Sequence, residues 1–246
     1  MQKSKENKKG VGKSYISKTK ILVIGLVCAG VFFAGRAVMN NILYSPRKEQ
    51  PKGTGPRIVC IGDSITFGFG VATSRDRDAW VRILGRELED RYEVLNYGIC
   101  GATLLSESDQ PYDPSFWQAA KDLEAQIYIL MLGTNDSKTK NWNKEEYTRQ
   151  LDERVKELLS VSSVEQLYLM APPPAFDALD NINGDVICNE VYGIVKACAE
   201  QNNVGFIDLF TPMKDRPDYM MDGIHPNVEG NAVVAQAVLE TLQNIM

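Results

Sequence analysis

The only histidine of the chain, His225, lies three residues after Asp222 and directly before Pro226, in the stretch MDGIHPN. An imidazole is the side chain best suited to take and return a proton near neutral pH. Such a base activates a serine hydroxyl, which is a weak nucleophile by itself, and Ser64 in GDSIT is the candidate. An aspartate one turn earlier can accept the second imidazole N–H and fix its tautomer. These residues predict a nucleophile, Ser64, a base, His225, and an orienting carboxylate, Asp222.

Short apolar runs alternate with segments of helical period after residue 56. We expect strands over 57–62, 92–98, 125–133, 166–174 and 204–210. We expect helices over 78–91, 143–161, 185–202 and 226–246. Asn143 caps the second of these helices, with Glu146 three residues on, and Pro226 lies in the first turn of the last. Apolar strands separated by helices predict a parallel sheet covered on both faces.

The carboxyl ends of parallel strands lie at one edge of a sheet, where α/β proteins place their working groups. Polar or glycine-rich stretches follow four of the expected strands: GDSIT the first, NYGICGAT the second, GTND the third and DGIHPN the fifth. Each stretch alone is also a common turn or helix-cap sequence. Their order along the chain favours one shared site.

Together the four stretches resemble the blocks of the SGNH, or GDSL-type, hydrolase and esterase family. These blocks are a serine in G-D-S, a glycine after the second strand, an asparagine in G-x-N-D and a histidine in D-x-x-H. The resemblance covers residues 57–246 and falls on Ser64, Gly101, Asn135, Asp222 and His225. It implies a flavodoxin-like three-layer α/β/α sandwich that acts as a serine carboxylic-ester hydrolase. The G-x-S-x-G elbow of ordinary α/β-hydrolases is absent, because GDSIT ends in threonine.

Attack by the serine produces an oxyanion, which needs donors that are already in place. The candidates are the backbone N–H groups of Ser64 and Gly101 and the side-chain amide of Asn135, with Gly101 resting on the resemblance. We interpret the adjacent Asp63 and Asp136 as acceptors that organise loops rather than as the carboxylate pair of a glycosidase.

Trp142 follows shortly after GTND, ahead of the helix expected from residue 143. It is a candidate substrate-binding residue, because an aromatic side chain there could line a sugar-binding cleft. A packing contact at the entry of the helix is the alternative, and the sequence leaves both interpretations open.

The composition fits one α/β domain with an N-terminal extension, with 246 residues and 44% apolar content. Residues 1–20 carry seven lysines and one glutamate, whereas the whole chain has a net charge of -5, so the body is acidic and nucleic acid is not an expected partner. An uncharged, largely apolar run extends from Ile21 to Gly35, is interrupted by Arg36 and continues as AVMNNILY to Tyr44.

These features predict four segments. We expect a cytoplasmic tail over 1–20, a transmembrane anchor over 21–44, a linker over 45–56 and the hydrolase domain over 57–246, outside the cell. A cleaved signal peptide and a buried helix are the alternatives for 21–44, and cleavage would give a secreted protein.

Five cysteines without CxxC or metal-like spacing predict buried thiols rather than a disulfide scaffold, and a Cys60–Cys100 bridge is left open. The chain contains no Walker A sequence and no GxGxxG at the start of a helix. One histidine and scattered cysteines do not make an ordinary zinc site. The sequence therefore predicts no metal and no cofactor.

The expected activity is that of a serine esterase that removes short acyl groups, acetyl foremost, from a carbohydrate or cell-envelope substrate through an acyl-enzyme. The alternatives are a lysophospholipase-like or lipase-like acyl hydrolase, an O-acyltransferase with the same triad, and, from another class, a non-catalytic envelope-binding module. The expected partners are a small acyl ester or acylated glycan and, through the N-terminal segment, the membrane. The sequence leaves the oligomeric state open.

Overall fold

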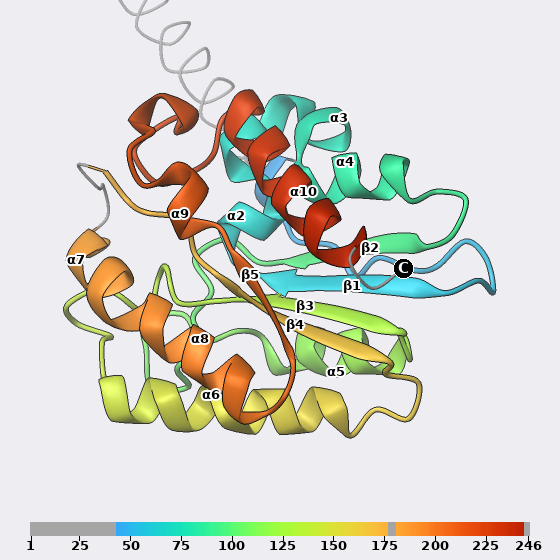
Figure 1. Cartoon of the computed structure of the whole chain (residues 1–246), viewed down its shortest axis with the longest axis horizontal. Helices are drawn as coiled ribbons and strands as arrows, with labels where there is room; N and C mark the ends of the chain where they lie inside the picture. The colour runs from blue at the N-terminus through green and yellow to red at the C-terminus, as the bar shows by residue number, and fades with distance from the viewer. Residues whose placement is uncertain (1–42, 177–180, 244–246) are drawn as a thin grey trace, which may run out of the picture. The chain divides into compact units, whose positions relative to one another are not determined.

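The strands of the computed structural model pair in parallel in the order β2-β1-β3-β4-β5, which is the doubly wound order of flavodoxin. The structure describes residues 43–176 and 181–243. The strand arrows point toward the same end in Figure 1. The strands are β1 (Arg57–Gly62), β2 (Glu93–Gly98), β3 (Ile127–Met131), β4 (Gln166–Ala171) and β5 (Gly205–Asp208).

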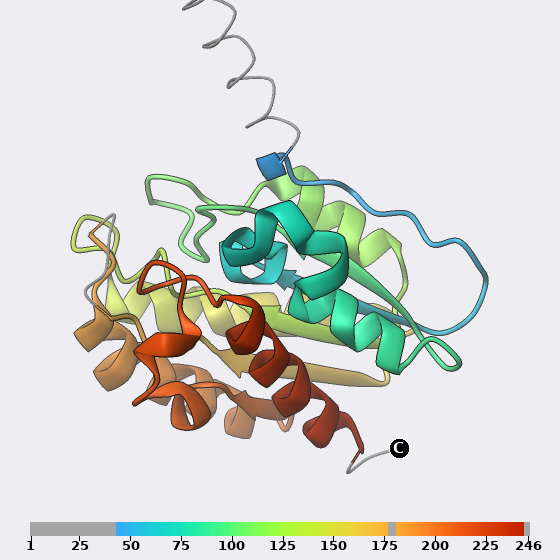
Figure 2. The same cartoon turned by 90° about the horizontal axis from the view of Figure 1, so that it is seen from above.

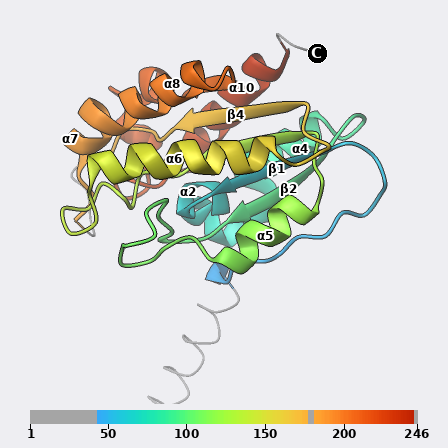
Figure 3. The same ribbon diagram turned by 90° about the horizontal axis from the view of Figure 1, so that it is seen from below.

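Helices cover both faces of the sheet (Figures 1 and 2). Helices α4 (Trp80–Glu87) and α10 (Val228–Gln243) lie on one face, whereas α5 (Pro114–Asp122), α6 (Lys144–Leu159) and α8 (Tyr192–Gln201) lie on the other (Figure 3). The shorter helices are α2 (Ser64–Phe67), α3 (Arg75–Asp78), α7 (Gly184–Val186), α9 (Phe210–Met213), η1 (Phe69–Ser74), η2 (Ile187–Val191) and η3 (Pro217–Tyr219).

Alternate residues of each strand supply two separate cores. Ile58 and Cys60 of β1 pack with Trp80 of α4 on the first face, whereas Val59 and Ile61 belong to the core formed with α5, α6 and α8. All five side chains are at most 1% exposed. Because successive side chains of a strand point to opposite faces, a strand that is apolar at every position must be covered twice. The prediction of a parallel sheet between helices is confirmed.

The last helix begins later than the sequence predicts. Pro226 does not lie in its first turn; it forms an isolated antiparallel bridge with Met220, and α10 starts at Val228. Asn227 makes the difference, because its side-chain Oδ1 accepts a hydrogen bond from the N–H of Gly230 at 3.0 Å, as an N-cap does. Pro226 therefore fixes the loop before the helix rather than the helix itself.

Two other helices differ from expectation. The helix expected over 78–91 corresponds to α4, which spans only Trp80–Glu87, because Ala79 has extended backbone that separates it from the short helix α3 before it. Helix α5 was not expected, although Asp113 caps it by accepting a hydrogen bond from the N–H of Ser115 at 2.7 Å and Pro114 is its first residue. Aspartate before proline is a recognised start signal for a helix. Asn143 caps α6 through the N–H of Glu146, as predicted.

The segment 45–56, expected as a linker, lies against the domain. The carboxylate of Glu49 pairs with Arg82 and accepts a hydrogen bond from the N–H of Asn96 at 2.9 Å. The backbone carbonyl of Glu49 accepts a hydrogen bond from the hydroxyl of Tyr97, also at 2.9 Å. These contacts attach the segment to β2 and α4.

The predicted tail 1–20 lies outside the described residues, as does the predicted anchor 21–44 except for its last two residues. Between residues 43 and 243, leaving aside 177–180, no helix is both long and apolar enough to cross a bilayer. The predictions for the N-terminal segments stay predictions.

Candidate active site

Ser64, His225 and Asp222 form one hydrogen-bonded chain, as the sequence predicts. Oγ of Ser64 lies 2.8 Å from Nε2 of His225, and Nδ1 of His225 lies 2.7 Å from Oδ2 of Asp222. With Nδ1–H donating to the carboxylate, Nε2 is left to accept the serine proton. Ser64 is 5% exposed, and the side chains of His225 and Asp222 are 13% and 19% exposed. The chain of hydrogen bonds is therefore largely shielded from solvent but not fully buried.

Ser64 is the first residue of α2, directly after β1. Asp63 caps this helix by accepting a hydrogen bond from the N–H of Ile65 at 2.9 Å. Gly62 ends β1, and a Cβ atom there would lie 2.2 Å from the hydroxyl of Thr66, so only glycine allows α2 to fold back this tightly. The result is a serine held at the carboxyl end of β1, next to the point where the strand order reverses.

The loop 221–225 holds Asp222 against His225. Oδ1 of Asp222 accepts hydrogen bonds from the N–H groups of Ile224 at 3.1 Å and His225 at 2.8 Å, and Gly223 takes the left-handed backbone that this turn requires, with φ of +84°. Burial acts to raise the pKa of Asp222, but the hydrogen bonds from the backbone and ring of His225 outweigh it and lower the pKa. Asp222 therefore stays a carboxylate that can stabilise a cationic imidazole.

Two loops carry the proposed oxyanion donors to the same edge of the sheet. Gly101 has φ of +81°, and a Cβ atom there would lie 2.5 Å from Oε1 of Gln110, which covers the loop from outside. Nδ2 of Asn135 donates to the carbonyl of Ala102 at 3.1 Å, which joins the loop after β3 to the loop after β2. The amide of Asn135 has two hydrogens, so this bond leaves one for an oxyanion.

Asp63 and Asp136 organise loops, as the sequence predicts. Both are fully buried, and the two oxygens of Asp136 accept hydrogen bonds from the N–H groups of Leu104 at 3.0 Å and Leu105 at 2.8 Å. Burial raises the pKa of Asp63 to about 6 against the opposing hydrogen bond from Ile65. Burial likewise raises the pKa of Asp136 to about 7 despite its two backbone donors, and the charge of Asp63 adds to the increase.

Trp142 makes the packing contact that was one of its two interpretations. Its ring lies 5.3 Å from that of Tyr147, and Tyr147 is fully buried with its hydroxyl donating to the carbonyl of Leu132. Trp142 is half-buried, and its role toward substrate stays a prediction. Cys60 and Cys100 are free thiols in the structure, so the bridge left open by the sequence is not formed.

An aromatic residue beside His225 and a second one packed on it were not predicted from the sequence. The ring of Phe69 lies 4.4 Å from that of His225, and the ring of Tyr44 lies 4.9 Å from that of Phe69. Phe69 stands between two glycines just after α2, and an aromatic residue in such a turn was the only signal. Tyr44 gave no signal, because it ends the apolar run expected to be an anchor. Over 43–176 and 181–243, no cluster of histidine, cysteine or acidic side chains fits a metal ion.

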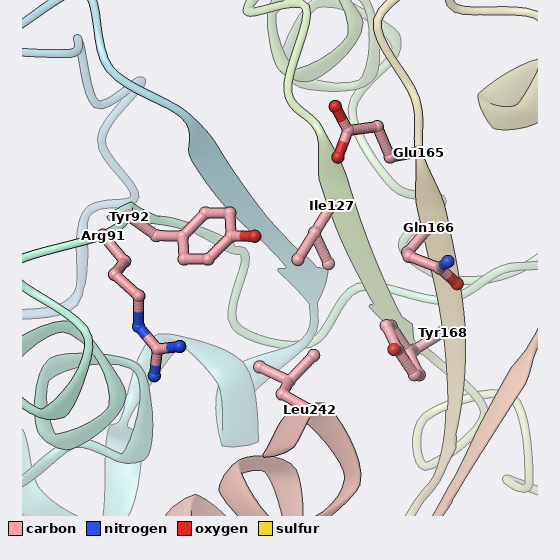
Figure 4. Close-up of a pocket in the computed structure, with 7 residues that line it drawn as sticks. All are labelled: Arg91, Tyr92, Ile127, Glu165, Gln166, Tyr168 and Leu242. Atoms are coloured by element: carbon pink, nitrogen blue, oxygen red, sulfur yellow. The ribbon is translucent and has the colours of Figure 1, made fainter. Parts of the chain in front are cut away.

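A hollow of about 340 Å³ lies at the amino ends of the strands, at the edge of the sheet opposite to the triad (Figure 4). It includes Ile127 and Gln166, which open β3 and β4, together with Tyr92 just before β2. Ser64 follows the carboxyl end of β1, so this hollow at the amino ends of the strands is remote from the triad.

The fold and the hydrogen-bonded triad define a serine hydrolase on a doubly wound sheet. The model of the GDSL-like Lipase/Acylhydrolase family matches residues 60–233, and the chain belongs to this family. The resemblance read from the four sequence blocks is thereby confirmed, and the family places the chain among the carboxylic-ester hydrolases.

A relative agrees with this assignment. An acetylxylan esterase of Xylanibacter ruminicola is 32% identical over 213 residues, which cover 78% of this chain and 44% of the relative. The chain thus spans less than half the length of that protein.

Solved structures show the same fold. A carbohydrate acetylesterase of Sinorhizobium meliloti, Est24, is similar with a TM-score of 0.63 and 22% identity, covering 78% of this chain and all of the other. The acetylxylan esterase Axe2 of Geobacillus stearothermophilus is similar with a TM-score of 0.60 and 22% identity, covering 77% of this chain and 94% of the other.

Proposed function

We propose that this protein is a serine esterase that removes short acyl groups, acetyl foremost, from carbohydrate esters through an acyl-enzyme. The observation that carries the proposal is the continuous hydrogen-bonded chain from Ser64 through His225 to Asp222. Ser64 acts as nucleophile, His225 as base and then acid, and Asp222 orients the imidazole and stabilises its cation.

The chemistry follows from this arrangement. Oγ of Ser64 attacks the ester carbonyl while its proton passes to Nε2 of His225, and the carbonyl electron pair moves onto the oxygen. The N–H groups of Ser64 and Gly101 and the amide of Asn135 stabilise that oxyanion. Collapse of the tetrahedral intermediate breaks the bond to the alcohol, which leaves with the proton from Nε2. A water molecule then repeats the sequence on the acyl-enzyme, releasing the acid and restoring Ser64.

Two observations favour a short acyl group on a sugar. The relative with 32% identity is an acetylxylan esterase, and both solved structures described above are named for acetyl esters of carbohydrates. Gln110 lies against Gly101, and its amide donates to the carbonyl of Cys100 at 2.6 Å. A polar amide beside this proposed oxyanion donor suits a short acyl chain better than a long apolar one.

A panel of chromogenic esters with acyl chains from C2 to C12, given to the full-length chain, tests the proposal. We expect hydrolysis of C2 to C4 esters by the wild type and none by Ser64→Ala, together with release of acetate from acetylated xylan. A maximum at C8 or longer would point to a lipase-like enzyme instead. If the wild type hydrolyses none of the esters, the esterase proposal is contradicted, and acyl transfer or a binding function is favoured instead.

We also propose that residues 21–44 anchor the protein in the membrane, with the domain outside the cell. The support is in the sequence: seven lysines precede an apolar run, and positive charge is retained on the cytoplasmic side. Protease added to intact cells should then remove the domain. Survival of the domain in intact cells, with digestion after lysis, would refute this topology, and its loss into the medium would indicate a cleaved signal.

A further inference from the structure

The triad holds the imidazole of His225 only at its edge. The hydrogen bonds to Ser64 and Asp222 both lie at ring nitrogens, and a planar ring held at two such points can still tilt about the line between them. Catalytic groups must be kept within about 0.5 Å and 10–20° of the productive geometry by neighbours that are themselves fixed. The faces of the imidazole therefore need a support that the triad does not provide.

Phe69 supplies that support. Its ring centroid lies 4.4 Å from that of His225 with the planes inclined by 39°, which places the two rings in direct contact. Aromatic pairs in contact attract each other beyond the effect of the area that they bury. Phe69 is half-buried, and so is His225, so the contact lies at the mouth of the site rather than in the core.

Phe69 is itself fixed by the element that carries the nucleophile. Gly68 ends α2 with φ of +90°, and its N–H donates to the carbonyl of Ser64 at 3.0 Å. On the other side, a Cβ atom at Gly70 would lie 2.2 Å from the carbonyl oxygen of Pro226, so the backbone on both sides of Phe69 touches fixed parts of the site. The position of Phe69 thus links the helix of Ser64 to the loop of His225.

Tyr44 backs Phe69 from a distant part of the chain. Its ring centroid lies 4.9 Å from that of Phe69 with the planes inclined by 28°. Tyr44 lies five residues before Glu49. Glu49 attaches this segment to the domain, because its carboxylate pairs with Arg82 of α4 and is hydrogen-bonded to Asn96 of β2. Tyr44 also lies outside residues 60–233, the part that the family model matches. The outer ring of this stack therefore comes from outside the part of the chain that the family model matches.

We propose that Phe69 is a positioning residue for His225 that favours its cationic form, with Tyr44 as the outer support. The cation exists while the imidazole holds the proton of Ser64, and the face of an aromatic ring within about 6 Å attracts a cation. The neutral imidazole gains less from the ring. The stack therefore acts on the transition state more than on the resting enzyme, which should appear in kcat rather than in KM. This inference rests on the proposed esterase mechanism.

The test compares full-length variants on the best short ester. Phe69→Leu keeps the site apolar but removes the aromatic face, and we expect kcat to fall about 5- to 30-fold with KM changed less than about twofold. Phe69→Tyr should restore kcat to within about twofold. Tyr44→Ala should reduce kcat by a few-fold, about 2- to 5-fold, because only the outer ring is lost. Phe206→Leu, a half-buried aromatic of β5 that packs on Tyr192, serves as control and should leave kcat unchanged.

A second readout does not depend on activity. His225 is the only histidine, so the ring protons of a histidine-labelled sample belong to one residue. In the wild type the ring current of Phe69 should displace these resonances upfield, and Phe69→Leu should return them toward the position of free imidazole. Circular dichroism establishes that each variant is folded, and Tyr44→Ala tests the stack if Phe69→Leu does not fold.

The outcomes separate this inference from the proposed function. Activity retained in Ser64→Ala would refute the esterase mechanism whatever Phe69 does. If Ser64→Ala is inactive, the positioning role alone fails when Phe69→Leu keeps kcat within twofold, when only KM changes, when Phe69→Tyr does not restore kcat, or when the histidine resonances do not move.

Discussion

Asp136 provides a stringent test of how the oxyanion loop is held. Its two carboxyl oxygens accept one hydrogen bond each from the N–H groups of Leu104 and Leu105, and all of its side chain is buried. Asp136→Ala leaves both N–H groups buried away from water and without a hydrogen-bond acceptor. Each buried unsatisfied group costs about 1–3 kcal/mol, so the free energy of unfolding should fall by about 2–6 kcal/mol. Asp136→Asn keeps one acceptor and should lose about 1–3 kcal/mol.

The raised pKa of Asp136 also predicts how the stability of the protein depends on pH. Because burial raises the pKa of Asp136 to about 7, the folded protein keeps a proton at pH 5 that the unfolded chain has released. This contribution to stability is complete below about pH 4 and is lost as the pH rises through 7, with a slope of at most about 1.4 kcal/mol per pH unit. Asparagine cannot titrate, so the loss caused by Asp136→Asn should be larger at pH 5 than at pH 8.

Urea denaturation at pH 5 and pH 8, followed by circular dichroism, measures these differences. Asp122→Asn is the control: Asp122 is exposed and accepts one hydrogen bond from Gln118, so its replacement should change stability by less than about 0.5 kcal/mol. We also expect kcat of Asp136→Asn to fall about 10- to 100-fold, because Gly101 lies in the loosened loop. Stability of Asp136→Ala within 0.5 kcal/mol of the wild type, or equal losses for Asp136→Asn at the two pH values, would refute the reasoning.

The remaining predictions concern the proposed catalytic residues. Ser64→Ala and His225→Ala should each reduce kcat by about 10⁴–10⁶-fold, and the double variant should lose little more; additive losses would show that the two do not act as a unit. Asn135→Ala should reduce kcat by about 10²–10³-fold, since two backbone donors remain, and an unchanged kcat would remove Asn135 from the oxyanion hole. Asp222→Asn should reduce kcat by about 10⁴-fold with an unchanged circular dichroism spectrum, because the wrong tautomer is then favoured; a loss below tenfold would contradict that role.

Local features of the site could be predicted because neighbours in sequence decide them. Asp222 and His225 are three residues apart, so one turn brings carboxylate and imidazole together, and the observed distance of 2.7 Å follows from the loop alone. The cap of α6 by Asn143, which accepts a hydrogen bond from the N–H of Glu146, is equally local. The sheet was predictable for a different reason. Strands that are apolar at every position have no face that can be exposed to water, so helices must cover both faces of the sheet.

Other features depend on contacts between distant parts of the chain. Ser64 and His225 are 161 residues apart, and nothing near either residue fixes the 2.8 Å between their atoms; the order of the strands does. The two interpretations of Trp142 could be weighed only once Tyr147 was seen to be core. The start of α10, by contrast, was misplaced although its determinants are local: Asn227 caps the helix, and Pro226 pairs with Met220 only six residues earlier.

The sequence by itself determined the residue types of the site, their order and the class of fold, because hydrophobic period and turn chemistry act over a few residues. Only the tertiary structure decided which side chains touch the imidazole from its face. Tyr44 and Phe69 are 25 residues apart, and they meet because Glu49 is hydrogen-bonded to β2 and Gly70 packs closely against the loop of His225. Packing of this kind depends on the whole domain, because the position of each ring is determined by contacts with its close-packed neighbours.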